Sequence, residues 1–241
     1  MKTNQINMTV TNTKTKPSNG QPYRRLWGRA KGKPLSPYQS GLVDTKLAEV
    51  SIDTESPLAG LESFDNIRME IGFGGAEHLL YRATENPNTA FIGVEPFLNG
   101  IAKALAGMDR REIKNIRLHH GDVWQFLENL PDNSLSHIDI LYPDPWPKAR
   151  HYKRRLIQED LISEFHRILK PGKTLHFASD IPSYVDWALL RICRHGGFQW
   201  HAQTCADWQT PYPDWPGTRY EAKAHREGRT PHYFRFVRAC D

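Results

Sequence analysis

Acidic side chains mark the ends of five short apolar runs in this sequence. They are Glu70, Glu95, Asp122, Asp144 and Asp180. If the runs are neighbouring parallel strands, their carboxyl ends meet at the edge of the sheet where open α/β proteins bind ligands. A single acid in such a turn is often only a helix cap or a turn former. Five together indicate a site for a ligand that carries positive charge and hydrogen-bond donors.

The first of these acids precedes a glycine-rich turn in the stretch EIGFGGAE at residues 70–77. Gly72 and the glycines after it allow a tight turn and a close approach of the backbone to a ligand. The dinucleotide pattern GxGxxG requires a glycine at position 77, but the chain has Glu77, which would repel a pyrophosphate. This disfavours a nicotinamide-dependent oxidoreductase and favours a nucleoside without phosphates.

Three of the acids match the groups of one such nucleoside. Glu95, about 20 residues past the glycines, is placed to accept hydrogen bonds from ribose hydroxyls. Asp122 could accept from the exocyclic amino group of adenine, and Glu70 could face an ammonium group. S-adenosylmethionine joins an adenosine to an amino acid through a cationic sulfonium. We therefore expect S-adenosylmethionine as the cofactor.

The stretch PDPWP at residues 143–147 follows the fourth apolar run. Pro143 and Pro145 fix their own φ angles and restrict the residue before each of them, so the carboxylate of Asp144 is held in one direction. Trp146 offers a flat face on which an extruded purine could stack, worth about 1–3 kcal/mol per base. Basic residues follow directly, and we expect phosphate contacts from Lys148, Arg150, Lys153, Arg154 and Arg155.

The elements that must position these residues alternate along the chain, as in a mostly parallel, doubly wound α/β sheet. The predicted strands are Ile67–Ile71, Thr89–Val94, Asn115–His119, His137–Leu141 and Thr174–Ala178. The predicted helices are Ala76–Thr84, Phe97–Arg110, Trp124–Leu130, Leu156–Leu169 and Tyr184–His195. Pro171 and Gly172 should stop the helix before them. Residues 198–204 and 231–239 should pair as an antiparallel hairpin at a sheet edge, and residues 34–66 are too irregular to assign.

Composition limits the classes of protein. The chain has 241 residues and a net charge of +5, which suits one α/β domain. Residues 1–40 hold eight Lys or Arg and no acid, so the excess positive charge lies on an N-terminal arm suited to RNA. We expect a disordered basic leader at residues 1–22 and a single domain at residues 23–241. No apolar span or secretory signal is present, which predicts a cytoplasmic protein. The three cysteines and the scattered histidines form no predicted metal site.

Several motifs resemble the bacterial tRNA (guanine-N7-)-methyltransferases, over a stretch from about Tyr23 to Arg238. EIGFG at 70–74, IGVE at 92–95 and GD at 121–122 are common to class I methyltransferases in general. PDPWPK at 143–148, the basic residues after it and TRYE at 218–221 are more specific. Ala149 stands where the family usually has another lysine. The resemblance implies a Rossmann-like, seven-stranded fold, and methyl transfer to the variable loop of tRNA at position 46.

The resemblance also implies roles for individual residues. Cofactor contacts fall on Glu70, Gly72, Glu95, Asp122 and Asp144, and substrate contacts fall on Lys148, Asp180, Thr218, Arg219, Tyr220 and Glu221. Guanine N7 has a free lone pair and no proton to remove, so Asp144 would act by positioning the base and stabilising the developing charge. Asp180 and Glu221 could accept from the guanine N1 and N2 protons. The active form would be a monomer or a homodimer.

Two alternatives remain open at this level. A methyltransferase for amino groups of adenine or cytosine carries a motif similar to Asn/Asp-Pro-Pro-aromatic, whereas here a single proline separates Asp144 from Trp146. A non-catalytic RNA-binding protein would keep the basic residues with a vestigial cofactor pocket. Binding of S-adenosylmethionine distinguishes the second alternative from an enzyme.

Overall fold

The structure is a computed structural model that describes residues 32–240. The predicted leader at residues 1–22, the domain start at residue 23 and most of the basic arm lie outside the described residues. Within these residues, seven strands form one sheet: β1 (Asn66–Ile71), β2 (Thr89–Val94), β3 (Ile116–His119), β4 (Leu135–Leu141), β5 (Leu169–Ser179), β6 (Phe198–Trp200) and β7 (His232–Arg238). Their order is β3-β2-β1-β4-β5-β7-β6. The first five strands in this order are parallel to one another, whereas β7 is antiparallel to β5 and β6 is antiparallel to β7.

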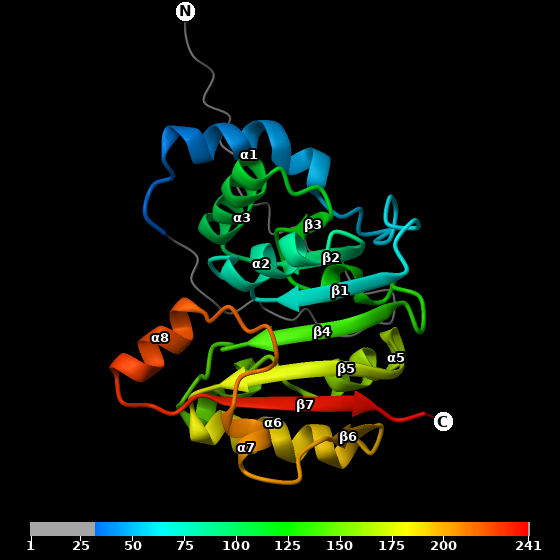
Figure 1. Ribbon diagram of the computed structural model, residues 1–241, viewed down its shortest axis with the longest axis vertical. Helices are drawn as coiled ribbons and strands as arrows, with labels where there is room; N and C mark the ends of the chain where they lie inside the picture. Colours follow the sequence, from blue (N-terminus) through cyan, green and yellow to red (C-terminus); the bar gives the residue numbers. More distant parts are fainter. Residues whose placement is uncertain (1–31, 241) are drawn as a thin grey trace, which may run out of the picture.

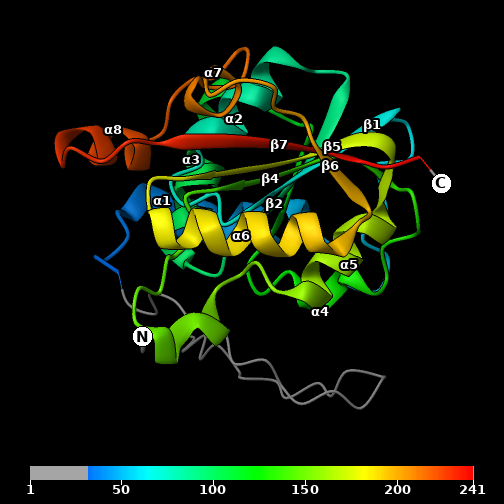
Figure 2. The same ribbon diagram turned by 90° about the horizontal axis from the view of Figure 1, so that it is seen from below.

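Helices cover both faces of this sheet. Those on the chain are α1 (Pro37–Val50), α2 (Glu77–Glu85), α3 (Leu98–Arg111), α4 (Trp124–Leu127), α5 (Glu159–Ile168), α6 (Pro182–His195), α7 (Ala206–Gln209) and α8 (Arg219–Arg226), with the 3₁₀ helix η1 at Ala149–Arg154. Figure 2 shows α5 and α6 on one side of the sheet and α2 and α7 on the other. One apolar cluster lies under α4 to α6, and a second joins α1 to α3 with β2 and β3.

The predicted doubly wound sheet is confirmed, with differences at particular elements. The helix predicted to reach Leu169 ends at Ile168, and β5 begins directly after it. Its start moves from residue 156 to Glu159, and the basic residues before it form the separate 3₁₀ helix η1. The two C-terminal strands pair as predicted, but β7 lies between β5 and β6.

Helix α1 occupies part of the stretch that sequence patterns left unassigned. Ser36 caps it, since the Ser36 hydroxyl accepts from the Gln39 backbone N–H at 3.2 Å while the Gln39 side chain accepts from the Ser36 N–H at 3.3 Å. Pro37 at its first position has a φ that suits a helix start. The helix packs on α3 and extends the layer that carries the glycine-rich turn.

Candidate active site

A cavity of about 1170 Å³ opens at the carboxyl ends of the central parallel strands. Figure 1 shows α8 beside the arrowheads of β4 and β5, at this same edge of the sheet. Four of the five predicted cofactor residues line the cavity: Gly72, Glu95, Asp122 and Asp144. The topology therefore gathers acids from the ends of β2, β3 and β4 around one opening.

Glu95 holds the glycine-rich turn in place. Its carboxylate accepts hydrogen bonds from the backbone N–H of Gly74 at 2.7 Å and of Phe97 at 2.9 Å. Gly72 and Gly74 have φ angles of 75° and 57°, a left-handed conformation that favours glycine. Burial raises the pKa of Glu95, and the two N–H donors oppose that shift. Each carboxylate oxygen keeps a second lone pair, so Glu95 can anchor the turn and still accept from a ligand.

Asp122 sits at the tip of β3 in a local network. Its side chain accepts from the Trp124 N–H at 3.2 Å, and its own N–H donates to the Gln125 side chain at 2.9 Å. The same Gln125 oxygen lies 2.8 Å from Nε2 of His119, so His119 is the donor of that hydrogen bond. Burial lowers the pKa of His119. A neutral imidazole thus braces the turn that carries Asp122.

The PDPWP loop leaves β4 with two residues in the left-handed region, Tyr142 at φ 53° and Trp146 at φ 41°. Asp144 lies between them, is exposed and lines the cavity. A positive φ is uncommon for bulky residues and occurs most often where function requires a fixed geometry. Trp146 is half-buried, with the Arg154 guanidinium 5.0 Å from its ring centroid. The predicted stacking platform is therefore partly covered by a cation.

The basic residues after the loop divide into two groups. Lys148, Arg150 and Lys153 are exposed, as a phosphate contact requires. Arg155 is 2% exposed, and its guanidinium donates to the Pro145 carbonyl at 2.9 Å, to the Ser183 carbonyl at 2.8 Å and to the Ser183 hydroxyl at 3.2 Å. RNA contact by Arg155 stays a prediction, and the structure gives this buried side chain a role in tying the loop to α6.

The TRYE motif forms the start of α8. Thr218 and Glu221 make a capping box, in which the Thr218 hydroxyl accepts from the Glu221 N–H at 3.1 Å. The Glu221 carboxylate also accepts from the Trp215 indole at 2.8 Å and from the Tyr233 hydroxyl. It is 8% exposed and does not line the cavity. Direct recognition of guanine by Glu221 stays a prediction, and the structure gives this residue a role in holding α8.

The two residues in the middle of that motif do reach the cavity. Arg219 lines it and forms an ion pair with Glu77 at the start of α2. Tyr220 also lines it, and a Cβ added at Gly74 would lie 3.1 Å from the Tyr220 ring. The glycine therefore leaves room for this tyrosine. Arg219 contacts the start of α2, and Tyr220 contacts the glycine-rich turn before it, so α8 closes one side of the opening.

Two further predicted acids, besides Glu221, lie outside the cavity lining. Glu70 is 5% exposed, and its carboxylate pairs with Nδ1 of His78 at 2.8 Å. Asp180, in the turn after β5, accepts from Nε of Arg229 at 2.5 Å. Both carboxylates already have a partner in the protein. Contacts of Glu70 with a cofactor and of Asp180 with guanine stay predictions.

Sequence patterns missed several cavity residues: Lys103, Trp124, Tyr142, Gln158 and Asp160. Tyr142 alone had a usable signal, since it is the residue directly before the first proline of the PDPWP loop. Lys103, on α3, and Gln158 and Asp160, near the start of α5, reach the cavity only through the packing of those helices. The capping pattern T-x-x-E was visible in the sequence and would have indicated the structural role of Glu221.

Comparisons with known proteins agree on one family. A family model described as a putative methyltransferase matches residues 65–233. A tRNA (guanine-N(7)-)-methyltransferase of Agrobacterium fabrum is 53% identical over 219 residues, 88% of this chain and 94% of that protein. One of Rhizobium meliloti is 50% identical over 220 residues, 89% of this chain and 95% of that protein.

Solved structures share the fold at lower sequence identity. A 16S rRNA (adenine(1408)-N(1))-methyltransferase variant from Catenulisporales acidiphilia, solved with cosubstrate SAM, has a TM-score of 0.51 and 19% identity, covering 79% of this chain and 93% of that one. The 16S rRNA methyltransferase KamB has a TM-score of 0.52 and 13% identity, covering 74% and 90%. At these identities the likeness establishes the fold alone. Among residues 32–240, no helix is long and apolar enough to cross a membrane.

Proposed function

This chain belongs to the tRNA (guanine-N7-)-methyltransferase family, and from that premise we propose that its cavity binds S-adenosylmethionine and that the protein methylates N7 of a guanine in the variable loop of tRNA, at position 46. The observation that carries the proposal is the convergence of Glu95, Asp122 and Asp144 from three strand ends on one opening. These carboxylates suit a cationic nucleoside ligand.

The hydrogen-bond acceptors that line the cavity match individual groups of this cofactor. Glu95 has lone pairs left for ribose hydroxyls, and Asp122 at the next strand end has them for an adenine amino group. The space beside Gly72 is open, because a Cβ added at this glycine would meet no atom within 4 Å. When bound, S-adenosylmethionine supplies an electrophilic methyl group on a cationic sulfur.

The chain's own groups have to position the guanine. N7 is nucleophilic as it stands, so no general base is required and acceleration comes from in-line placement and from charge. Asp144, on a loop fixed by two prolines and two left-handed residues, stabilises the positive charge that develops on the purine. Tyr220 and Arg219 face the opening from α8 and contact the substrate, while Thr218 and Glu221 keep α8 in place.

Phosphates of the tRNA are bound by the exposed cations beside the loop, Lys148, Arg150 and Lys153. Such contacts position the RNA and make affinity depend on salt, without reading sequence. Arg154 lies against the Trp146 ring, and the N–H groups in its guanidinium plane remain able to donate to a phosphate. The arrangement brings one extruded guanine to the mouth of the cavity.

The proposal is tested with an unmodified tRNA transcript, the full chain and S-adenosylmethionine. Chemical cleavage at N7-methylguanosine should produce one break, in the variable loop. Asp144→Ala should lower kcat by about 100-fold at saturating cofactor and tRNA, whereas Asp186→Ala, which removes an exposed acid on α6, should leave it unchanged. A break elsewhere in the tRNA would overturn the position, and near-normal turnover of Asp144→Ala would overturn its role.

A further inference from the structure

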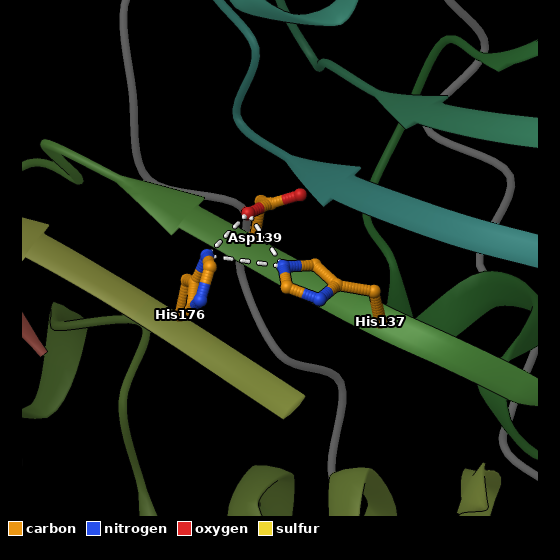
Figure 3. Close-up of side chains that lie close together, drawn as sticks. All are labelled: His137, Asp139 and His176. Atoms are coloured by element: carbon orange, nitrogen blue, oxygen red, sulfur yellow. Dashed lines mark hydrogen bonds and ion pairs between the residues drawn. The ribbon is translucent and has the colours of Figure 1, made fainter. Parts of the chain in front are cut away.

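Three side chains outside the cavity meet in the middle of the sheet. His137 and Asp139 lie on the same face of β4, and His176 lies beside Asp139 on β5. One carboxylate oxygen of Asp139 is 3.0 Å from Nε2 of His137 and 3.3 Å from Nδ1 of His176, and the two nitrogens are 3.1 Å apart. Figure 3 shows the three atoms converging on one point. The scattered histidines predicted no ligand set from the sequence, yet the strand register brings these three side chains together.

Hydrogen bonds alone do not satisfy this triangle. If both ring nitrogens carry protons, both donate to Asp139, and two N–H groups then face each other across 3.1 Å. If only one carries a proton, the other directs its lone pair at the carboxylate oxygen, so two acceptors face each other. If neither carries a proton, all three atoms are acceptors. While the Asp139 carboxylate is ionised, every placement of protons on the two rings leaves at least one edge repulsive.

A cation at the centre makes all three contacts favourable, since each atom then directs a lone pair at it. Ligand atoms about 2.0–2.1 Å from a zinc ion lie about 3.3 Å apart at tetrahedral angles, close to the edges of this triangle. Two imidazoles and one carboxylate form a donor set that first-row transition metals accept. The side chains of His137 and His176 are only 11% and 14% exposed, so the protein surrounds most of this site.

The surroundings hold the three donors in position. The second oxygen of Asp139 accepts from Nη2 of Arg68 at 3.1 Å, which turns the first oxygen toward the histidines. The His176 ring stacks on Tyr212, with centroids 3.7 Å apart and an angle of 6° between the planes. Glu70 lies next to Asp139 in the register of β1 and β4, and its carboxylate pairs with His78. Such outer contacts orient ligands at metal sites.

We propose that His137, Asp139 and His176 bind one divalent transition-metal ion of the zinc type, which links β4 to β5. None of the three lines the methyl-transfer cavity, so the ion has a structural role and its binding does not depend on the function proposed above.

The test measures metal on the full chain rather than activity. Chelator-stripped protein is titrated with Zn²⁺ and, in parallel, with Co²⁺, whose visible absorption reports the ligand geometry. Wild type should bind one equivalent and unfold at a higher temperature with Zn²⁺ than with Mg²⁺. Asp139→Asn and His176→Gln should each weaken Zn²⁺ binding by more than about 10-fold. His195→Gln alters the His166–His195 ring pair, which the structure shows without a carboxylate, and should bind as wild type does.

The titration of wild type decides the proposal even if a variant fails to fold. No stoichiometric Zn²⁺ binding by wild type would overturn it, as would full binding by both Asp139→Asn and His176→Gln. Loss of binding in His195→Gln alone would also overturn it, because the ion would then lie at another histidine pair. A failure of methyl transfer leaves these readouts untouched.

Discussion

Replacement of Arg155 tests whether this cation stabilises the fold or binds RNA. Three hydrogen bonds join its guanidinium to Pro145 and Ser183, and the Tyr152 ring centroid lies 3.8 Å from the guanidinium carbon. Hydrogen bonds to a charged group contribute about 1.5–3 kcal/mol each, but Met at this position also removes the cost of burying a cation. We therefore expect Arg155→Met to lower the free energy of unfolding by about 2–4 kcal/mol.

The assay compares stability with the salt dependence of tRNA binding. A loss of that size lowers the melting temperature of a domain this long by about 4–16 °C. Lys153→Met removes the same charge from an exposed position and should leave stability unchanged. It should instead reduce the slope of log Kd against log salt by about 0.7–0.9, the value for one phosphate contact.

Arg155→Lys makes the test sharper, because it keeps the charge and loses the planar fork of donors. If the fork is what matters, this variant loses most of the stability that Arg155→Met loses, and its salt slope matches wild type. The reasoning is refuted if Arg155→Met unfolds as wild type does while its salt slope falls as that of Lys153→Met does.

Three further changes test the braces around the cavity. Glu95→Gln replaces one carboxylate oxygen by an NH₂ group and cannot keep both hydrogen bonds, from Gly74 and from Phe97. Calorimetry should find S-adenosylmethionine bound about 10- to 100-fold more weakly, and an unchanged Kd would contradict the role of Glu95 in holding the turn. Tyr233→Phe removes a donor to buried Glu221 and should cost about 1–3 kcal/mol in urea unfolding, and equal stability would exclude that contact. Burial lowers the pKa of His119 in the folded protein, so the unfolded chain takes up its proton first and stability is lost as pH falls through about 6.5; an NMR titration that places the folded pKa above the ordinary value would reverse the sign.

The parallel half of the sheet was predictable because each strand there is a short segment rich in apolar residues between helix-forming segments. Strand register was not needed to place Glu95, Asp122 and Asp144 together, since topology alone puts the carboxyl ends of those strands at one edge. Helix α1 was missed although Ser36 and Gln39 form a capping box that can be recognised in sequence. The apolar periodicity of that helix is weak, so its cap was the only local signal.

What could not be predicted depends on tertiary packing. Arg155 has the same local sequence context as Lys153, and only the approach of Ser183 on α6 makes it a buried residue. Glu70 occupies a strand position that matched a cofactor motif, but α2 brings His78 over it. His176 lies 39 positions from His137, and only the register of β4 and β5 makes them neighbours.

The place of β7 in the sheet also affects how the protein is made. Residues 232–238 leave the ribosome after every other strand, yet they supply the partner of β5 on one side and of β6 on the other. Until then β5 has an open edge and β6 has no neighbour, a condition that favours pairing between nascent chains. A translation product that stops before His232 therefore keeps the cofactor half of the sheet, but β5 has an unpaired edge and Phe177 lacks its contact with Phe234, which makes the product a target for chaperones and proteases.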